Sequence, residues 1–283
     1  MKISVVIPTY KRDASLAVCL EALRGQVDER IAEVVVTDDA GPSSPTAAMV
    51  AQRFPFARWV AGPHRGPAAN RNHGATLTTG EFVLFLDDDV EPGPTLINGY
   101  ARAIDPQFSV YEGRTTCRAG LRSPFDVSPV NETGGWLWSC NLMVRRSLLL
   151  EAGGFDEQFP QAHMEDVAFR DRLKATGARM RFVPEATVDH PPRRLPGGRV
   201  LARQHESYIL YQYKYAKQAP SLPEFVLILL RFRTTAILTR SLSADSFRAL
   251  ASMAVETAHV LKNWRRWDAK WKGQFTAGQA VGP

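Results

Sequence analysis

Residues 81–92 read Glu-Phe-Val-Leu-Phe-Leu-Asp-Asp-Asp-Val-Glu-Pro, and this stretch decides the fold that we expect. Five consecutive apolar residues, Phe82 to Leu86, are followed at once by three carboxylates, and Pro92 ends the stretch. A short apolar run between breakers is typical of a strand buried on both faces, as in a parallel sheet between two helix layers. We therefore expect the three acids where a buried strand leaves the core.

These three acids predict a site for a divalent metal ion. Strand alternation places Asp87 and Asp89 on one side and Asp88 on the other. Adjacent like charges repel, and an oxygen-preferring cation such as Mg²⁺ or Mn²⁺ would remove that repulsion. A solvated acidic turn is the alternative. The position favours the metal, because open α/β sheets bind ligands at the carboxyl ends of their strands.

Strands and helices alternate from the first residue. The expected strands are Ile3–Ile7, Glu33–Thr37 and Arg58–Ala61, and the expected helices are Asp13–Leu23, Pro45–Phe54, Pro67–Leu77 and Pro94–Ile104. This alternation predicts βαβ units and an α/β fold with a mainly parallel, Rossmann-like sheet flanked by helices. The first strand is followed by Pro-Thr-Tyr-Lys-Arg without a GxGxxG turn, so a nicotinamide cofactor is not expected.

The pattern changes after residue 105. We expect strands Ser109–Thr116, Trp136–Arg145 and Arg179–Val183, a helix Met164–Thr176 and a long loop Cys117–Gly135. A loop of that length usually marks a functional segment. Helices Val200–Lys217, Leu222–Leu242 and Ala244–Trp271 then form a C-terminal helical extension.

Composition and cysteine use limit the class of protein. With 283 residues and 45% hydrophobic content, the chain can form one large domain or one domain with an appendage. The three cysteines, Cys19, Cys117 and Cys140, show no CxxC spacing, so neither a disulfide framework nor a zinc site is indicated and a reducing cytosol is expected. The N-terminus reads as a strand and not as a signal peptide, and no apolar run is long enough to span a bilayer.

Charge is distributed unevenly along the chain. Residues 1–190 carry 20 basic and 24 acidic side chains, whereas residues 191–283 carry 15 and 5. A basic tail indicates contact with an anionic partner such as a membrane surface, a lipid phosphate or a nucleic acid, and a solvated basic face is the alternative. The expected helix Leu222–Leu242 has an apolar stripe flanked by arginines, which fits either an interfacial helix or a helix packed on the body.

Six motifs in order resemble the family 2 glycosyltransferases with the GT-A fold. They are Val5-Val6-Ile7-Pro8-Thr9-Tyr10, Thr37-Asp38-Asp39, Asn70-Arg71-Asn72-His73-Gly74, Leu86-Asp87-Asp88-Asp89, Gly153-Gly154-Phe155-Asp156-Glu157 and Glu165-Asp166. The resemblance covers about residues 2–190. It implies a GT-A catalytic domain over residues 1–195, with a nucleotide-binding half (1–105) and an acceptor half (106–195), and leaves 196–283 as a basic helical extension.

The resemblance assigns the donor side. It implies that Pro8, Thr9, Asp38 and Asp39 hold the nucleoside and that Arg71 reaches the diphosphate, for which a forked guanidinium is suited. A carboxylate can accept from N3–H of uracil, which favours a UDP or dTDP sugar, although it can also accept from guanine. Ordinary turn acids and a surface arginine are the alternatives.

The same resemblance assigns Asp89 to the metal and Asp87 to the sugar or ribose side. We group Asp88 with the cofactor-binding residues without a separate role from the resemblance. His190 would be a further metal ligand, since imidazole suits Mn²⁺ and some GT-A enzymes use a histidine near this place. A structural histidine is the alternative.

On the acceptor side, the resemblance makes Asp166 the catalytic base, with Glu165 in reserve. Acids at a helix start are also favoured by the helix dipole without any chemistry. We expect Trp136 and Trp138 on one strand face, where they would offer a platform for a sugar, or else core packing. His163 is a further candidate for the acceptor site.

These observations together predict a metal-dependent inverting glycosyltransferase of bacterial polysaccharide or glycoconjugate synthesis. It would use Mn²⁺ or Mg²⁺ and transfer a sugar from a nucleotide-sugar donor, UDP favoured, to a saccharide or lipid-linked acceptor. We expect a cytoplasmic protein with peripheral contact to the inner membrane face, no nucleic-acid partner, and leave homodimer formation open. The alternatives are a sugar-nucleotide pyrophosphorylase and a non-catalytic module that binds a nucleotide or a nucleic acid.

Overall fold

A computed structural model describes residues 1–240 and 244–276 of the chain. By its internal contacts the chain divides into two compact units: unit 1 comprises residues 1–118, 129–157 and 165–191, and unit 2 comprises 119–128, 158–164 and 192–283. Residues 119–128 and 158–164 therefore belong to the same unit as the C-terminal helices, although they precede the expected domain boundary at residue 195. Leu242 of the expected second helix and residues 277–283 lie outside the described residues.

Unit 1 is built on a mixed, mostly parallel sheet with the strand order β3-β2-β1-β4-β8-β6-β9-β5. Its strands are β1 (Ile3–Thr9), β2 (Ile31–Asp38), β3 (Ala57–Ala61), β4 (Phe82–Leu86), β5 (Glu91–Pro92), β6 (Val110–Thr116), β8 (Asn141–Arg145) and β9 (Met180–Asp189). The first four pair in parallel, as β9 does with β6, whereas β8 is antiparallel to β4 and β6 and β5 is antiparallel to β9. The predicted fold class is confirmed.

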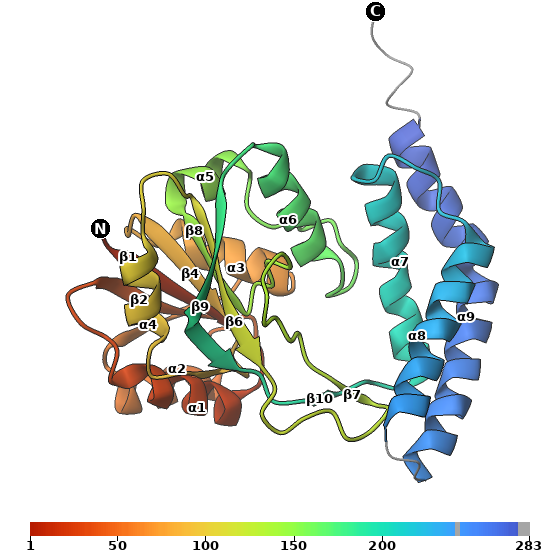
Figure 1. The fold of residues 1–283 in the computed structure, drawn as a ribbon, viewed down its shortest axis with the longest axis horizontal. Helices are drawn as coiled ribbons and strands as arrows, with labels where there is room; N and C mark the ends of the chain where they lie inside the picture. Colours follow the sequence, from red (N-terminus) through yellow and green to blue (C-terminus); the bar gives the residue numbers. More distant parts are fainter. Residues whose placement is uncertain (241–243, 277–283) are drawn as a thin grey trace, which may run out of the picture. The chain divides into compact units, whose positions relative to one another are not determined.

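Helices cover both faces of this sheet (Figure 1). They are α1 (Asp13–Arg24), α2 (Pro45–Arg53), α3 (Pro67–Thr76), α4 (Leu96–Ala103), α5 (Arg146–Glu151) and α6 (Glu165–Ala175). Apolar side chains of α1, α2 and α4 share one core with the sheet, and those of α3, α5 and α6 share the other. The sheet is thus sandwiched between two helix layers.

Strand β4 is the centre of this arrangement. All five of its residues are buried. Phe82, Leu84 and Leu86 belong to one core, and Val83 and Phe85 to the opposite one. Burial of each such side chain contributes about 1.5–3 kcal/mol, so the strand is held firmly from both sides. The prediction of a strand buried on both faces is confirmed, and the strand ends directly before the acidic residues.

Two strand predictions need correction. The strand expected over Trp136–Arg145 begins only at Asn141, because Gly134, Gly135 and Leu137 have positive φ angles of 84°, 98° and 53°, which a strand cannot contain.

The strand expected to end at Val183 instead continues to Asp189. A register shift lies between Gly113 and Arg114 of β6, where the partner of Gly113 is Val183 and the partner of Arg114 is Thr187. Three residues of β9 are thereby left without a partner in the ladder, and such an irregularity accommodates Pro184, which has no N–H to donate.

Unit 2 contains α7 (Gly198–Lys214), α8 (Leu222–Thr239) and α9 (Ala244–Thr276), which run side by side in Figure 1, and a short ribbon of β7 (Asp126–Val127) with β10 (Arg193–Arg194). Phe225, Leu229 and three tryptophans of α9 are among its core residues. Buried Glu256 of α9 joins the helices: it accepts two hydrogen bonds of 2.9 Å from Arg233 of α8 and lies 2.8 Å from Nε2 of His205 of α7.

Among the residues that the structure describes, no helix has both the length and the apolar character needed to cross a bilayer.

Candidate active site

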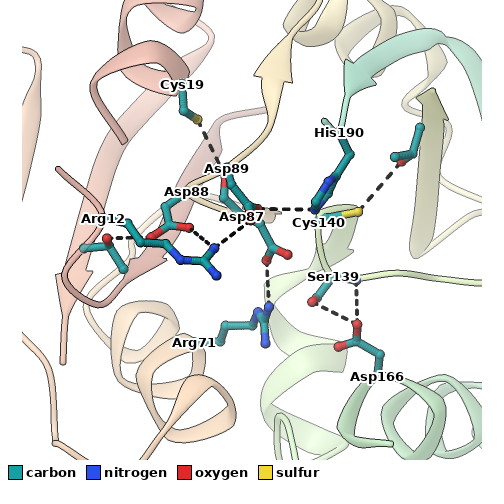
Figure 2. A network of polar contacts seen from close by, with 12 residues as sticks. Arg12, Cys19, Arg71, Asp87, Asp88, Asp89, Ser139, Cys140, Asp166 and His190 are labelled. Carbon is teal, nitrogen blue, oxygen red and sulfur yellow. Dashed lines mark hydrogen bonds and ion pairs between the residues drawn. The ribbon is translucent and has the colours of Figure 1, made fainter. Parts of the chain in front are cut away.

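The site lies at the carboxyl ends of the neighbouring strands β2, β1 and β4, where polar side chains follow each buried run. Figure 2 shows that Asp87 contacts Arg71, whereas Asp88 and Asp89 both contact Arg12. Asp88 accepts a hydrogen bond of 2.7 Å from Oγ1 of Thr9, and Arg12 Nη1 lies 3.2 Å from Asp88 Oδ1 and 2.6 Å from Asp89 Oδ2. Asp88 is thereby engaged by the first strand and its loop.

Asp87, Asp89 and His190 form a cluster that could hold a metal ion. One ligand atom from each of the three lies within 4.8 Å of the other two. His190 Nδ1 is 2.9 Å from the carbonyl oxygen of Pro191, a contact that suits a protonated Nδ1 and leaves Nε2 as the coordinating atom. Nε2 lies 3.3 Å from Asp89 Oδ1. Two carboxylates and one imidazole are donors that suit Mn²⁺ and Mg²⁺.

Asp88 is a buried carboxylate with a raised pKa. Burial raises the pKa of Asp88 to about 6, while the hydrogen bond from Thr9 and the charge of Arg12 oppose the rise and the two adjacent carboxylates add to it. The metal-ligand cluster of Asp87, Asp89 and His190 does not include Asp88. The three acids follow the end of β4, with Asp88 and Asp89 in a turn and not in the strand. Asp88 therefore connects the acidic strand end to β1.

Arg71 is a buried cation in the middle of α3. Its Nη2 lies 2.7 Å from Asp87 Oδ1, and its guanidinium lies 5.5 Å from the ring centroid of Phe155. Burial alone would lower the pKa of Arg71, but the charges of Asp87, Asp166 and Glu165 outweigh burial and raise it. Within residues 1–240 and 244–276, Nε and Nη1 have no hydrogen-bond partner, a costly state that an anionic ligand would relieve.

Glu165 and Asp166 begin helix α6. Asp166 Oδ2 accepts hydrogen bonds from the backbone N of Ser139 at 3.3 Å and from its Oγ at 3.1 Å, while the buried Oδ1 has no partner in the described part of the chain. Burial raises the pKa of Asp166, against the charge of Arg71 and the hydrogen bonds from Ser139. Burial, together with the charge of Asp166, raises the pKa of Glu165 to about 7.

The residues expected at the nucleoside also order the loops around them. Pro8 and Thr9 end β1, and Asp38 ends β2, where it accepts from the backbone N of Ala40 at 2.8 Å and from Trp59 Nε1 at 3.3 Å. Asp39 accepts from the backbone N of His64 at 3.0 Å and of Gly66 at 2.8 Å. A carboxylate can accept more than two hydrogen bonds, so Asp38 and Asp39 can order these loops and still contact a nucleobase.

The acceptor candidates are divided between the two units. Trp136 and Trp138 lie in the loop before β8 and not on a strand, but their rings are stacked, with centroids 5.4 Å apart and planes 12° apart. Trp138 packs against the core, and Trp136 is exposed. His163 belongs to unit 2, where its ring is 6.2 Å from that of His205. Burial, with His205 and Arg233, lowers the pKa of His163 to about 4.

Three residues at this site were not predicted from the sequence: Arg12, Ser139 and Glu112. Each contacts a partner that is far away in the chain, such as Asp89 for Arg12 and Asp166 for Ser139. Glu112 of β6 accepts hydrogen bonds from the loop that carries the tryptophans. Only the pairing of distant strands brings these groups together, so no local pattern marks them.

Comparisons with known proteins identify the family to which this fold belongs. Residues 4–121 match the family described as glycosyl transferase family 2. The chain belongs to family 2 of the glycosyltransferases and has the GT-A fold. This assignment speaks against the pyrophosphorylase alternative.

Two relatives from Mycobacterium tuberculosis are similar in sequence. The pre-mycofactocin glycosyltransferase is 30% identical over 213 residues, which are 68% of this chain and 43% of that protein. The N-acetylglucosaminyl-diphospho-decaprenol L-rhamnosyltransferase is 27% identical over 255 residues, covering 72% of this chain and 82% of that protein. The chain thus spans less than half the length of the first relative.

Among solved structures, a mannosyltransferase from Pyrobaculum calidifontis in complex with GDP-Man and Mn²⁺ has the same fold. It aligns over 98% of this chain and 85% of its own, with a TM-score of 0.56 and 20% sequence identity. At this identity, the likeness concerns the fold.

Proposed function

We propose that this protein transfers a sugar from a nucleotide-sugar donor to an acceptor hydroxyl with inversion at the anomeric carbon. The observation that carries the proposal is the placement of three kinds of group at one sheet edge. They are the metal-ligand cluster of Asp87, Asp89 and His190, the buried cation Arg71, and the buried carboxylate of Asp166. A binding module needs the first two but not the third.

The donor would lie across the ends of β1, β2 and β4. Pro8, Thr9, Asp38 and Asp39 would hold the nucleoside, and the two nitrogens of Arg71 that lack a partner among the described residues, Nε and Nη1, would bind the diphosphate. A UDP sugar remains the favoured donor, because a carboxylate can accept the N3–H of uracil. Guanine also offers donors to a carboxylate, so GDP sugars belong in any test.

Asp89 and His190 would hold the metal together with Asp87, which keeps its contact with Arg71. When bound, Mn²⁺ or Mg²⁺ would supply Lewis-acid stabilisation of the departing nucleoside diphosphate. Asp88 would steady the strand end through Thr9 and Arg12.

Asp166 would act as the catalytic base. In the transfer, the acceptor oxygen forms a bond to the anomeric carbon, the bond from that carbon to the phosphate oxygen breaks, and the acceptor proton passes to Asp166. The bond electrons leave with the nucleoside diphosphate. Oδ1 of Asp166 is free of hydrogen bonds from the described residues, whereas Oδ2 is held by Ser139. Glu165 is the reserve base.

The acceptor would be a saccharide or a lipid-linked saccharide, with a sugar ring against Trp136 and Trp138. Unit 2 suits a peripheral contact with an anionic membrane. Four apolar residues of α8 are well exposed: Leu227 (68%), Ile228 (54%), Phe232 (60%) and Leu238 (77%). Exposed Arg231 lies among them, and apolar surface flanked by arginine suits an anionic lipid surface. His163 stays a candidate for the acceptor.

A thermal-shift screen of UDP, GDP, dTDP and CMP, each with and without Mn²⁺, tests the donor side. A ligand that binds the folded state raises its melting temperature by mass action. We expect UDP to stabilise the protein and Mn²⁺ to increase the effect. Stabilisation by none of the four nucleotides, with or without the metal, would contradict the proposed function.

A further inference from the structure

Glu112 is a buried carboxylate to which the sequence assigned no role. It lies in β6, is 4% exposed, and is paired with Leu142 on β8 and Phe182 on β9. A carboxylate that leaves water needs hydrogen bonds to replace its hydration. The groups that supply them here identify what Glu112 holds.

Among the described residues, the donors that contact the Glu112 carboxylate come from one loop, residues 131–137. Oε2 accepts from Asn131 Nδ2 at 2.9 Å, from the backbone N of Trp136 at 3.2 Å and from that of Leu137 at 3.0 Å, and Oε1 accepts from the backbone N of Gly135. Three successive amides thus converge on one carboxylate. Such a set of N–H groups forms an anion-binding concavity, and here the anion is part of the protein.

The loop backbone is shaped to make this wrapping possible. Gly134 and Gly135 have positive φ angles, and a Cβ on Gly134 would lie 2.9 Å from the Cβ of Phe182. The backbone N of Gly134 also donates to Asn131 Oδ1 at 2.8 Å. Asn131 in turn exchanges two backbone hydrogen bonds with Thr115 of β6, at 2.9 and 2.8 Å. The loop is therefore tied to β6 at both of its ends.

The loop carries two features that have a part in the proposed sugar transfer. Its tryptophans, Trp136 and Trp138, are stacked on each other. The next residue is Ser139, which holds Oδ2 of Asp166. Trp136 itself supplies one of the amides that Glu112 binds, and Trp138 and Ser139 are the two residues after the last of these amides, that of Leu137.

We propose that Glu112 is a positioning residue for sugar transfer. It fixes residues 131–139 in the conformation that stacks the tryptophan pair for an acceptor sugar and aims Ser139 at Asp166. This inference rests on the proposed function. The position requires a carboxylate, because an acid anion offers only acceptors, whereas an amide in its place would turn an NH₂ group toward one of the converging N–H donors.

The test compares Glu112→Gln with Glu132→Gln, which removes an exposed carboxylate from the same loop. The first readout is hydrogen exchange of the amides of residues 135–137, followed by mass spectrometry. The second is the exciton-coupled circular dichroism of the stacked tryptophans, which Trp136→Phe serves to assign. We expect Glu112→Gln to speed exchange at least tenfold and to lose the exciton signal, and Glu132→Gln to change neither by more than twofold.

The third readout is transfer from a panel of UDP-, dTDP- and GDP-sugars to octyl glycosides as acceptor probes. We expect Glu112→Gln to raise KM for the acceptor at least tenfold and to lower kcat, while the affinity for UDP with Mn²⁺ stays within twofold. A fold that was merely loosened would weaken nucleotide binding as well. If Glu112→Gln does not fold, Asn131→Ala removes one of the four donors, and the same pattern is expected with smaller changes.

Unchanged exchange in the variant would overturn the inference, because Glu112 would then not hold the loop. Faster exchange with an unchanged acceptor KM would also overturn it, because the loop would then not matter for transfer. A parent chain that transfers no sugar from any donor would contradict the proposed function itself, which separates that failure from a failure of the role of Glu112.

Discussion

Ser139 holds Asp166 by two hydrogen bonds to the same carboxylate oxygen, 3.3 Å from its backbone N and 3.1 Å from its Oγ. The other oxygen, Oδ1, is left without a bond from the described residues. The carboxylate is therefore oriented through one oxygen while the second stays available for a proton. This is the arrangement that a general base requires.

Asp166→Asn should abolish transfer, by at least a thousandfold in kcat, because an amide cannot take the acceptor proton. Binding of UDP with Mn²⁺, measured by calorimetry, should stay within threefold, since among the described residues the hydrogen bonds of Asp166 come from Ser139 and not from the metal cluster or the nucleoside residues. Asp171→Asn on the same helix is the matched control and should transfer at the parent rate. Transfer by Asp166→Asn at the parent rate would remove Asp166 as the base.

Ser139→Ala should move the acid limb of the pH profile of kcat to higher pH by about one unit, since a hydrogen bond to a charged group is worth about 1.5–3 kcal/mol. Burial raises the pKa of Asp166, and the bonds from Ser139 oppose that rise. The base works deprotonated, so activity falls as pH drops through its pKa. Loss of the hydroxyl raises this pKa further. Ser147→Ala, an exposed serine, is the control, and an identical acid limb in both variants would contradict the role of Ser139.

Asp89→Ala and His190→Ala should each weaken Mn²⁺-dependent binding of UDP at least tenfold, because each removes one of three clustered ligand groups. Binding of UDP in the presence of EDTA should be the same in parent and variants. Titration calorimetry measures the affinity for UDP in the presence of Mn²⁺ and in the presence of EDTA. Glu29→Ala removes an exposed acid elsewhere and serves as the control. Retention of the full Mn²⁺ effect in Asp89→Ala would argue against the metal site.

Glu165→Gln should stabilise the protein at pH 8 relative to the parent and have little effect at pH 5. The pKa of Glu165 is raised to about 7 from an ordinary 4.5, so the folded state binds its proton more tightly. Stability from this group is present at low pH and is lost as pH rises toward 7, on the order of 3 kcal/mol in total. Thermal unfolding at the two pH values measures the difference. Glu151→Gln, which replaces an exposed acid, should show no such pH dependence. If Glu165→Gln changed stability by the same amount at pH 5 and pH 8, Glu165 would not have the raised pKa.

The double variant Ile228→Ser with Phe232→Ser should reduce co-sedimentation with vesicles of phosphatidylglycerol severalfold, because it removes two exposed apolar side chains of α8. Neutral phosphatidylcholine vesicles should bind the parent more weakly than anionic ones. Val18→Ser removes an exposed apolar residue of α1 and serves as the control. Equal sedimentation of parent and double variant would argue against membrane contact through α8.

Much of the fold could be predicted because its signals are local. The apolar run of β4, bounded by acids and Pro92, shows its double burial within a few residues, and the alternation of strands and helices gives the parallel half of the sheet. The failures concern the second half. Trp136 and Trp138 look like strand residues by type, but Glu112 takes the backbone N–H groups that a strand would need for its ladder. That competition is invisible without knowing which strand lies beside the loop.

The candidate site divides in the same way. By itself, the sequence determined the family and singled out the acids at residues 87–89 and the pair Glu165-Asp166 as candidate site residues, because residue type and position at the end of an element can be read from the local chain. Only the tertiary structure decided which groups meet. It brought His190 to within 3.3 Å of Asp89, Arg71 to Asp87 and Ser139 to Asp166, through contacts between residues 16 to 101 positions apart. The physical reason is that a carboxylate's charge and orientation depend on burial and on partners, and both are set by how distant strands pair.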